Sequence, residues 1–278
     1  KRQGIRVPAG DFSAKIMVKV GQLNSKDFPD SKKYAIPLSI TGASNYSLIP
    51  SQRSAILLLN RSILSSVAKV SGGEGIRIKP VGMHTKAEWT IQMSAIYSSL
   101  TRSNLTTAYL SNGTGGAFYT RISSTAGIQV KNGRDGDDTW TQMPLQAGKW
   151  LHITYVHKDK KTTVYVNGKV QKVFENSAIT FGENSMIVVG NSGYRNDYLR
   201  EIRLWDKALT ESEINDYLYL PMDPATPHLI SYLPLSKEME TKDLKAPAGT
   251  ENVTTKARIE YVENVKFPAD ELVIVNQE

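Results

Sequence analysis

The chain has 278 residues, of which 40% are hydrophobic and 22% are charged, so it can bury the core of one or two globular domains. It contains no cysteine, which excludes disulfides, zinc–cysteine sites and cysteine nucleophiles. The sequence also lacks any run of about 18 apolar residues, the length that would predict a membrane-spanning helix.

The net charge of +7 is unevenly distributed. Residues 1–82 hold 13 Lys or Arg against 4 Asp or Glu, whereas residues 83–278 hold 21 against 23. This difference predicts two units with different surroundings. The cations of the first unit stand singly between apolar residues, and no nucleic-acid-binding motif accompanies them. We therefore expect the solvated face of a sheet and no nucleic-acid partner.

Three segments of the first unit have the composition of β-strands. Ser13–Val20 and Tyr34–Ile40 alternate apolar with other residues, and Ser54–Leu59 is a short apolar run. Pro37 cannot donate a hydrogen bond to a neighbouring strand, which favours an edge strand or a bulge. Strands at this spacing are typical of an immunoglobulin-like sandwich.

The phrases VPAGDFSAKIMVKV, YAIPLSITGAS and SAILLL carry a more specific resemblance over about residues 5–60. They are similar to an uncharacterised β-sandwich domain at the N-termini of Bacteroidetes surface lipoproteins. The resemblance implies a glycan-utilisation setting, in which related proteins carry family-18 glycosidase or laminin-G-like domains. It also implies that the first strands of this domain, an export signal and a lipid-anchored cysteine precede Lys1.

The second unit is predicted to begin near Pro80. Its expected strands alternate apolar and polar residues or are short apolar runs, at 89–97, 107–110, 117–121, 127–130, 150–157, 162–166 and 186–189. Asn167-Gly168 predicts a tight hairpin, because both residues tolerate positive φ angles.

The segment 198–205 predicts a strand in which Leu199, Glu201, Arg203 and Trp205 face one way and the residues between them face the other. Thr210 and Glu213 have the spacing of a capping box at the start of a helix. A connector containing Pro221, Pro224 and Pro227 follows, and late strands are expected at 228–235 and 259–267.

Two phrases, GKWLHITYVHKDKKTTVYVNGKV and GYRNDYLREIRLWDKALTESEI, resemble in the right order the laminin-G-like, concanavalin A-type jelly roll. The predicted fold class is therefore all-β, with an Ig-like sandwich at residues 1–79 and a laminin-G-like jelly roll at residues 80–278. The resemblance specifies the fold and says little about chemistry.

Catalytic motifs are missing from the sequence. Glycosidases of this fold that resemble laminarinases carry a Glu-x-Asp-x-x-Glu strand motif, which the chain lacks. The only similar spacing, Glu211-Ser212-Glu213, lies at a helix start, where acidic residues favour the helix dipole. His84, His152, His157 and His228 show no metal-binding spacing, and His152 and His157 are expected on opposite faces of one strand. We predict a protein without enzymatic activity, with a glycoside hydrolase as the less favoured alternative.

One acidic loop suggests a calcium site. Asp135, Asp137 and Asp138 offer three carboxylates in a flexible segment, and calcium prefers such oxygen ligands. The alternative is a solvated turn, the usual place of acidic loop residues.

Aromatic and polar loop residues suggest a sugar site, because sugar rings stack on aromatic faces and their hydroxyls need donors and acceptors. Trp140 follows the acidic loop, although it could instead pack as the first residue of a strand. The other candidates form one run: Tyr194, Arg195, Asn196, Asp197 and Tyr198. We predict a glycan-binding protein of the outer-membrane surface, attached only through an upstream lipid anchor, with glycan importers and glycosidases as partners. A protein–protein or adhesion module is the alternative.

Overall fold

The computed structural model describes residues 4–21, 23–59, 61–81, 86–100, 106–109, 118–131, 136–175, 179–182, 185–190 and 194–276. Nearly all regular structure is antiparallel β-strand, which confirms the all-β prediction. The described residues form one α-helix, α1 (Glu211–Asp216), and two 3₁₀ turns, η1 (Pro50–Gln52) and η2 (Asp137–Thr139). No helix in this part of the chain has the length and hydropathy needed to cross a bilayer.

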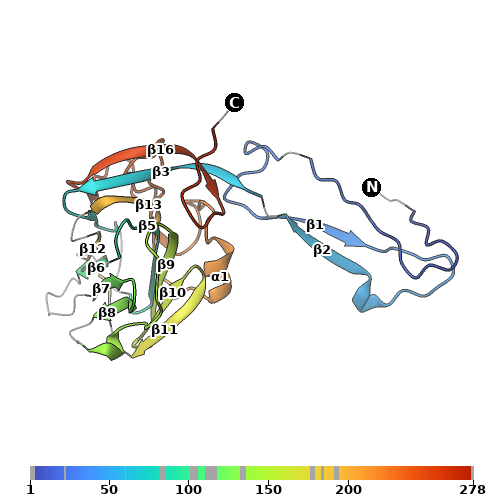
Figure 1. Ribbon diagram of the computed structural model, residues 1–278, viewed down its shortest axis with the longest axis horizontal. Helices are drawn as coiled ribbons and strands as arrows, with labels where there is room; N and C mark the ends of the chain where they lie inside the picture. The colour runs from blue at the N-terminus through green and yellow to red at the C-terminus, as the bar shows by residue number, and fades with distance from the viewer. Residues whose placement is uncertain are drawn as a thin grey trace.

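Two sheets form a sandwich (Figure 1). The strands of the larger sheet run in the order β11 (Lys169–Glu175), β10 (Lys161–Val166), β9 (Trp150–Lys158), β5 (Trp89–Ile96), β13 (Tyr194–Trp205), β3 (Ile63–Gly72) and β16 (Arg258–Phe267), with β14 (Leu229–Leu233) also paired to β13. The smaller sheet runs β15 (Val253–Thr254), β4 (Ile76–Ile78), β12 (Met186–Val189), β6 (Thr106–Tyr109), β7 (Phe118–Ser123) and β8 (Gly127–Lys131). The late strands predicted at 228–235 and 259–267 are confirmed as β14 and β16.

The main core lies between the two sheets and is centred on Trp89 of β5. The indole Nε1 of Trp89 donates to the Ile179 carbonyl oxygen at 2.9 Å, and its ring stacks on His157 with centroids 5.1 Å apart. Phe118 meets the same indole edge-on at 5.2 Å. Trp89 therefore packs in the core, as its alternating strand predicts.

The predicted Asn-Gly hairpin is confirmed between β10 and β11. Asn167 has a φ of 51° and Gly168 a φ of 74°, the pair of positive angles that such a turn needs. A Cβ on Gly168 would collide with the side chain of Asn215 on α1. The turn thus closes the hairpin directly beside α1.

The predicted alternation along β13 is wrong after Arg200, because the strand contains a bulge. Glu201 has a φ of 55°, and the pairing with β5 shifts between Arg200 and Arg203. The extra residue moves Ile202 and Leu204 into the same core as Leu199. Arg203 and Trp205 consequently join Arg200 on the outer face of the large sheet, where their partners lie.

The outer face of the large sheet is covered by α1 and by C-terminal segments. Thr210 and Glu213 form the predicted capping box, with both reciprocal hydrogen bonds present. Ile214 of α1 is fully buried against Val156, Tyr165 and other residues of the outer face. A second outer cluster joins Trp150 and Phe267, whose ring centroids are 5.1 Å apart.

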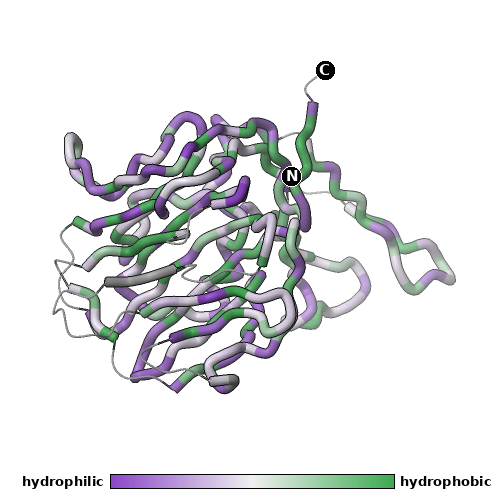
Figure 2. Tube along the Cα trace, turned by 60° about the vertical axis from the view of Figure 1, so that its left-hand side comes forward, coloured by the Kyte–Doolittle hydropathy of each residue, from purple (hydrophilic) through white to green (hydrophobic). Residues whose placement is uncertain are grey.

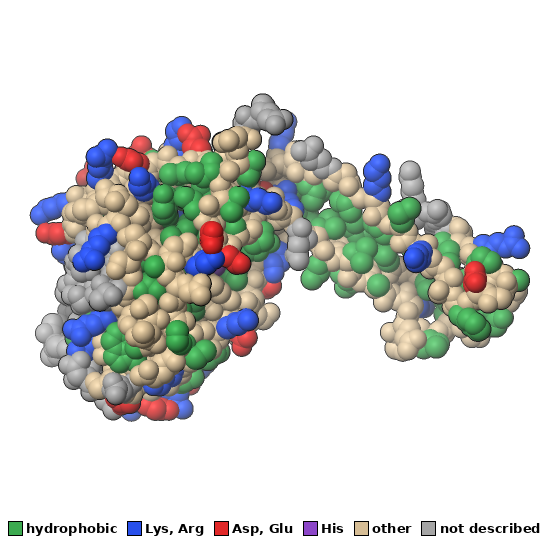
Figure 3. All heavy atoms as spheres, viewed as in Figure 1, with side chains coloured by type: hydrophobic (Ala, Val, Ile, Leu, Met, Phe, Trp, Pro, Cys, Tyr) green, Lys and Arg blue, Asp and Glu red, His purple; other side chains and the backbone are tan. Residues whose placement is uncertain are grey.

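The described residues before β3 form an arm that extends from the sandwich (Figures 1 and 2). Its regular strands are β1 (Tyr34–Ser39) and β2 (Ser54–Leu59), which pair in a separate two-stranded sheet. The predicted strand at Ser13–Val20 is wrong: the segment is irregular, because its alternating residues have no neighbouring strand to pair with. Large apolar side chains remain exposed on the arm, as Figure 3 shows, with Ile56 at 68% and Leu58 at 72%.

The division at residues 79 and 80 and the Ig-like identity of the first unit stay predictions. Strands β3 and β4, which that division assigns to the first unit, pair with strands of the sandwich. At the base of the arm, Arg61 forms an ion pair with Asp30. Lys33 of the arm also pairs with Asp216 of α1 at 2.7 Å.

Candidate functional site

The predicted sugar-binding run at the start of β13 is only partly accessible. Tyr194 is buried, and its hydroxyl donates to the Val189 carbonyl oxygen at 2.6 Å. Asp197 is also buried, with Oδ1 accepting hydrogen bonds from the Ser98 amide and hydroxyl at 2.9 and 3.1 Å. These two side chains anchor the strand and are not presented to a ligand.

The remaining predicted contact residues lie in two places. Arg195 and Asn196 are exposed, and Tyr198 is half-buried against the Trp150 cluster. Trp140 is half-buried beside β8, where its backbone forms an isolated β-bridge with Gln129 at the edge of the smaller sheet. The run from Tyr194 to Tyr198 begins β13, an inner strand of the other sheet. Their contact with sugar stays a prediction.

The predicted calcium loop is described only in part. Asp135 lies outside the described residues, as does the side chain of Asp137, whereas Asp138 is exposed in η2. The Asp138 backbone carbonyl accepts a hydrogen bond from Lys172 of β11 at 2.8 Å. Among the described side chains, no group of three or more acidic or histidine residues could hold a metal ion. Calcium binding stays a prediction.

The histidines on β9 face opposite sides of their sheet, as predicted. His157 lies in the core, where Nδ1 meets the Thr162 hydroxyl at 3.0 Å and Nε2 accepts from the Ile179 amide at 3.2 Å. Burial lowers the pKa of His157 to about 4. On the outer face, burial and two nearby arginines lower the pKa of His152 to about 3. Both imidazoles are neutral at pH 7, and His84 lies outside the described residues.

A buried charged network occupies the outer face next to the β13 bulge. Arg203 donates from Nη2 to Glu201 Oε2 at 2.5 Å and to the Leu220 carbonyl oxygen at 2.6 Å. Tyr232 donates its hydroxyl proton to Glu201 at 3.0 Å and accepts from the Met222 amide at 3.0 Å. Burial and the Glu201 carboxylate raise the pKa of Tyr232, so its hydroxyl stays protonated. The buried Arg203 and Glu201 side chains therefore offset each other's charge.

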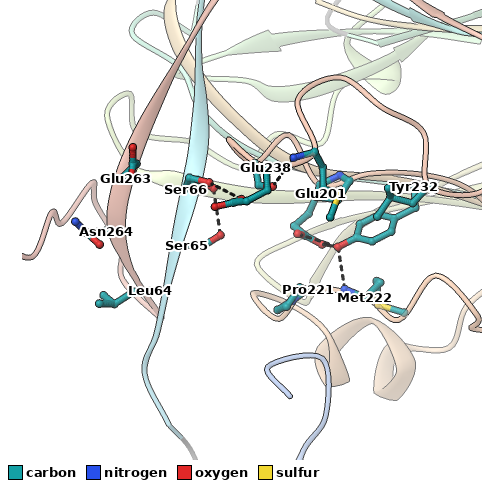
Figure 4. A pocket seen from close by; sticks show the side chains of 14 residues that line it. Leu64, Ser65, Ser66, Glu201, Pro221, Met222, Tyr232, Glu238, Glu263 and Asn264 are labelled. Atoms are coloured by element: carbon teal, nitrogen blue, oxygen red, sulfur yellow. Dashed lines mark hydrogen bonds between the residues drawn. The ribbon is translucent and has the colours of Figure 1, made fainter. Parts of the chain in front are cut away.

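A pocket of about 340 Å³ opens beside this network (Figure 4). It lies between β3, β16 and the segment 221–244, and its volume is within the range of small-molecule sites, roughly 300–1,000 Å³. Its polar lining consists of Ser65, Ser66, Glu201, Tyr232, Ser236, Glu238, Glu263 and Asn264. Its apolar lining consists of Leu64, Pro221, Met222, Pro234, Met239 and Leu244.

The middle of the pocket wall is held by Ser66 of β3. Its hydroxyl accepts a hydrogen bond from the Lys237 amide at 2.8 Å and donates to Glu238 Oε2 at 3.4 Å. Figure 4 shows Ser66 and Glu238 in the middle of the lining, with Glu201 and Tyr232 on one side and Glu263 and Asn264 on the other. Hydroxyls, carboxylates and apolar walls therefore meet in one place, as binding of a polyhydroxylated ligand requires.

The pKa values of the pocket carboxyl groups bear on whether they could act as a glycosidase acid–base pair. Such a pair needs one carboxylic acid with a raised pKa to protonate the leaving group. Hydrogen bonds from its own backbone amide, Ser236 and Ser66 instead lower the pKa of Glu238. Glu201 is held by Arg203 and Tyr232 inside the protein.

Sequence reasoning missed this pocket. Its lining comes from β3, β13, β14, β16, the start of the predicted connector at Pro221 and Met222, and the segment 234–244 after β14. One signal was available: Arg200, Glu201 and Arg203 are the charged residues of the segment 198–205, which is otherwise apolar or aromatic. Charges in such a strand indicate a buried network, because an unpaired buried charge is costly.

Comparison with known proteins agrees with the observed fold. Residues 71–215 match the family model of the concanavalin A-like lectin/glucanases superfamily. A crystal structure from Bacteroides ovatus, whose protein is proposed to bind carbohydrate, aligns with a TM-score of 0.57 at 17% identity, covering 88% of this chain and 72% of that one. No curated protein matches the sequence.

Two further solved structures align at lower scores. The heptameric SAP-like pentraxin from Limulus polyphemus has a TM-score of 0.48 at 13% identity, covering 72% of this chain and 94% of that one. Trypanosoma rangeli sialidase in complex with sialic acid has a TM-score of 0.43 at 15% identity, covering 55% of this chain and 27% of that one. The family match spans more than half of the 278 residues, and the chain therefore belongs to the concanavalin A-like lectin/glucanases superfamily.

Proposed function

We propose that this protein is a non-catalytic carbohydrate-binding protein and that it holds glycans in the pocket beside Glu201 and Tyr232. The pocket is the observation that carries the proposal: it combines hydroxyl and carboxylate groups with apolar walls. A sugar presents hydroxyls to the first and C–H groups to the second. The Bacteroides ovatus protein with a similar fold is itself proposed to bind carbohydrate, which supports the same ligand class here.

The test is a titration of the protein with glycans that bind in an array screen. Ser65 is half-buried on β3 and lines the pocket, so Ser65→Trp would fill the space that a sugar needs. Thr163→Trp is the matched control, since Thr163 is half-buried on β10 of the same sheet and outside the pocket. We expect Ser65→Trp to weaken glycan binding at least about tenfold, the effect of losing roughly 1.4 kcal/mol. Equal affinities for the two variants would reject the pocket as the site.

The cellular setting is part of the proposal. The resemblance of residues 5–60 to Bacteroidetes surface lipoproteins supports an exported protein of the outer membrane, anchored by an upstream lipid. There it would deliver glycans to importers and glycosidases of a glycan-utilisation system. Antibody labelling of intact cells tests the location, and labelling only after lysis would contradict it.

A second candidate function is supported by the arm. Exposed apolar side chains on β2 are typical of surfaces that contact other proteins, with Leu58 72% and Ile56 68% exposed. An adhesion module would bind its protein partner there. Ile56→Lys with Leu58→Lys would then abolish adhesion of cells displaying the protein and leave glycan binding intact. Adhesion unchanged by this double substitution would remove the candidate.

A further inference from the structure

The charged groups that line the pocket all have one sign. Glu201, Glu238 and Glu263 contribute carboxylates, and no Lys, Arg or His is among the fourteen lining residues. The low pKa of Glu238 keeps its carboxylate ionised at neutral pH. A ligand in this pocket therefore meets acceptors of hydrogen bonds that carry negative charge.

Nearby cations pair with two of the three carboxylates, Glu201 and Glu263. Lys237 pairs with Glu263 through its ammonium group, and both side chains are about half exposed, at 57% and 53%. Arg203 directs its donors to Glu201 and to the carbonyl oxygens of Tyr217 and Leu220. Arg200 lies over the Phe267 ring, with its guanidinium carbon 4.0 Å from the centroid, and donates to the Tyr219 carbonyl oxygen at 2.8 Å. Arg200 Nη2 also lies 3.5 Å from Glu201 Oε1, so both arginines offset the charge of Glu201.

We propose that the pocket accepts sugar units without negative charge and rejects uronic acids, sialic acids and sulfated sugars, with Glu238 as the specificity-determining residue. The inference rests on the proposed function and adds the ligand class. Neutral hydroxyls donate to Glu238, whereas an anionic substituent would face the Glu238 carboxylate, a charge of the same sign. Burying an unpaired negative charge beside others is unfavourable even in a partly solvated site.

Glu238 is the residue whose charge can be changed with the least disturbance. It is exposed, and its contacts are hydrogen bonds from its own amide, Ser236 and Ser66, so Glu238→Gln and Glu238→Lys should fold as the wild type does. Glu175→Gln and Glu175→Lys are matched controls. Glu175 is also exposed and lies on β11, at the edge of the large sheet opposite β16.

The experiment measures affinity for an acidic polysaccharide and for its carboxyl-reduced form, alongside a panel of neutral and sulfated oligosaccharides. We expect the wild type to bind neutral glycans and to bind acidic forms at least about threefold more weakly, the scale of a partly screened charge contact. Glu238→Lys should remove or reverse this preference, and the Glu175 variants should keep it. The preference should also shrink as salt rises to about 1 M.

Two other outcomes distinguish a failure of the charge selectivity from a failure of the proposed function. Equal binding of neutral and acidic glycans by the wild type, unchanged in Glu238→Lys, would overturn the charge selectivity and leave carbohydrate binding standing. No binding to any glycan of the panel would overturn the proposed function, and the selectivity with it.

Discussion

Glu201 and Arg203 lie two positions apart on β13, and both side chains reach the outer face of the large sheet because Glu201 sits in a bulge. Arg203 Nη2 is 2.5 Å from Glu201 Oε2, and the two side chains are 3% and 4% exposed. The Tyr232 hydroxyl donates to the same Glu201 oxygen at 3.0 Å. This pair supports the wall of the pocket, so the fold and the proposed site depend on the same contact.

Glu201→Gln should destabilise the protein by about 3 kcal/mol, because the substitution leaves a buried guanidinium without its counter-charge. Urea denaturation followed by tryptophan fluorescence measures the loss. Glu175→Gln removes an exposed ion pair with Lys161 and should cost at most about 1 kcal/mol. Similar losses for the two variants would show that the buried pair is not important for stability.

Gly168→Ala should destabilise more than Gly148→Ala, although both residues have positive φ angles of 74° and 76°. Each substitution strains the backbone by about 1 kcal/mol. A Cβ at Gly148 meets nothing within 4 Å, whereas one at Gly168 collides with Asn215 of α1. The difference in melting temperature between the two variants isolates the collision. Equal melting temperatures would mean that α1 shifts to accommodate the new Cβ at no cost in stability, which would contradict the prediction.

Stability should fall as the pH drops from 6.5 towards 4. Burial lowers the pKa of His157 from 6.5 to about 4, so protonation favours the unfolded chain throughout this window. The contribution of neutral His157 to the free energy of unfolding is fully present above pH 6.5. By pH 5, His157 alone lowers the free energy of unfolding by about 2 kcal/mol.

Urea denaturation at pH 7 and at pH 5 measures this loss, and His157→Gln should reduce it. The amide of glutamine is uncharged at both pH values, so the variant does not take up a proton at this position when it unfolds. A loss of stability that is the same in the variant and the wild type would contradict the assignment to His157.

Local patterns predicted those parts of the fold that local contacts determine. The Asn167-Gly168 turn and the Thr210–Glu213 capping box need only residues close in sequence, and both are present. The alternating strands of the sandwich were also predictable, because one face of each is buried in the core.

Other parts depend on contacts between distant segments and could not be predicted. Ser13–Val20 alternates like a strand, yet without a neighbouring strand it forms no ladder. The Glu201 bulge is stabilised by partners such as Tyr232 and the Leu220 region, far along the chain. For the same reason the pocket was missed: Ser66 and Glu238, which form the middle of its lining, are 172 positions apart.

The most direct test of the account is a crystal structure of the protein with a neutral oligosaccharide that binds in solution. We predict a sugar unit between Ser65, Glu238 and Met222, with hydroxyls within hydrogen-bond distance of Glu238. A sugar bound instead at Trp140, at Arg195 to Tyr198 or on the arm, with the pocket holding only water, would contradict it.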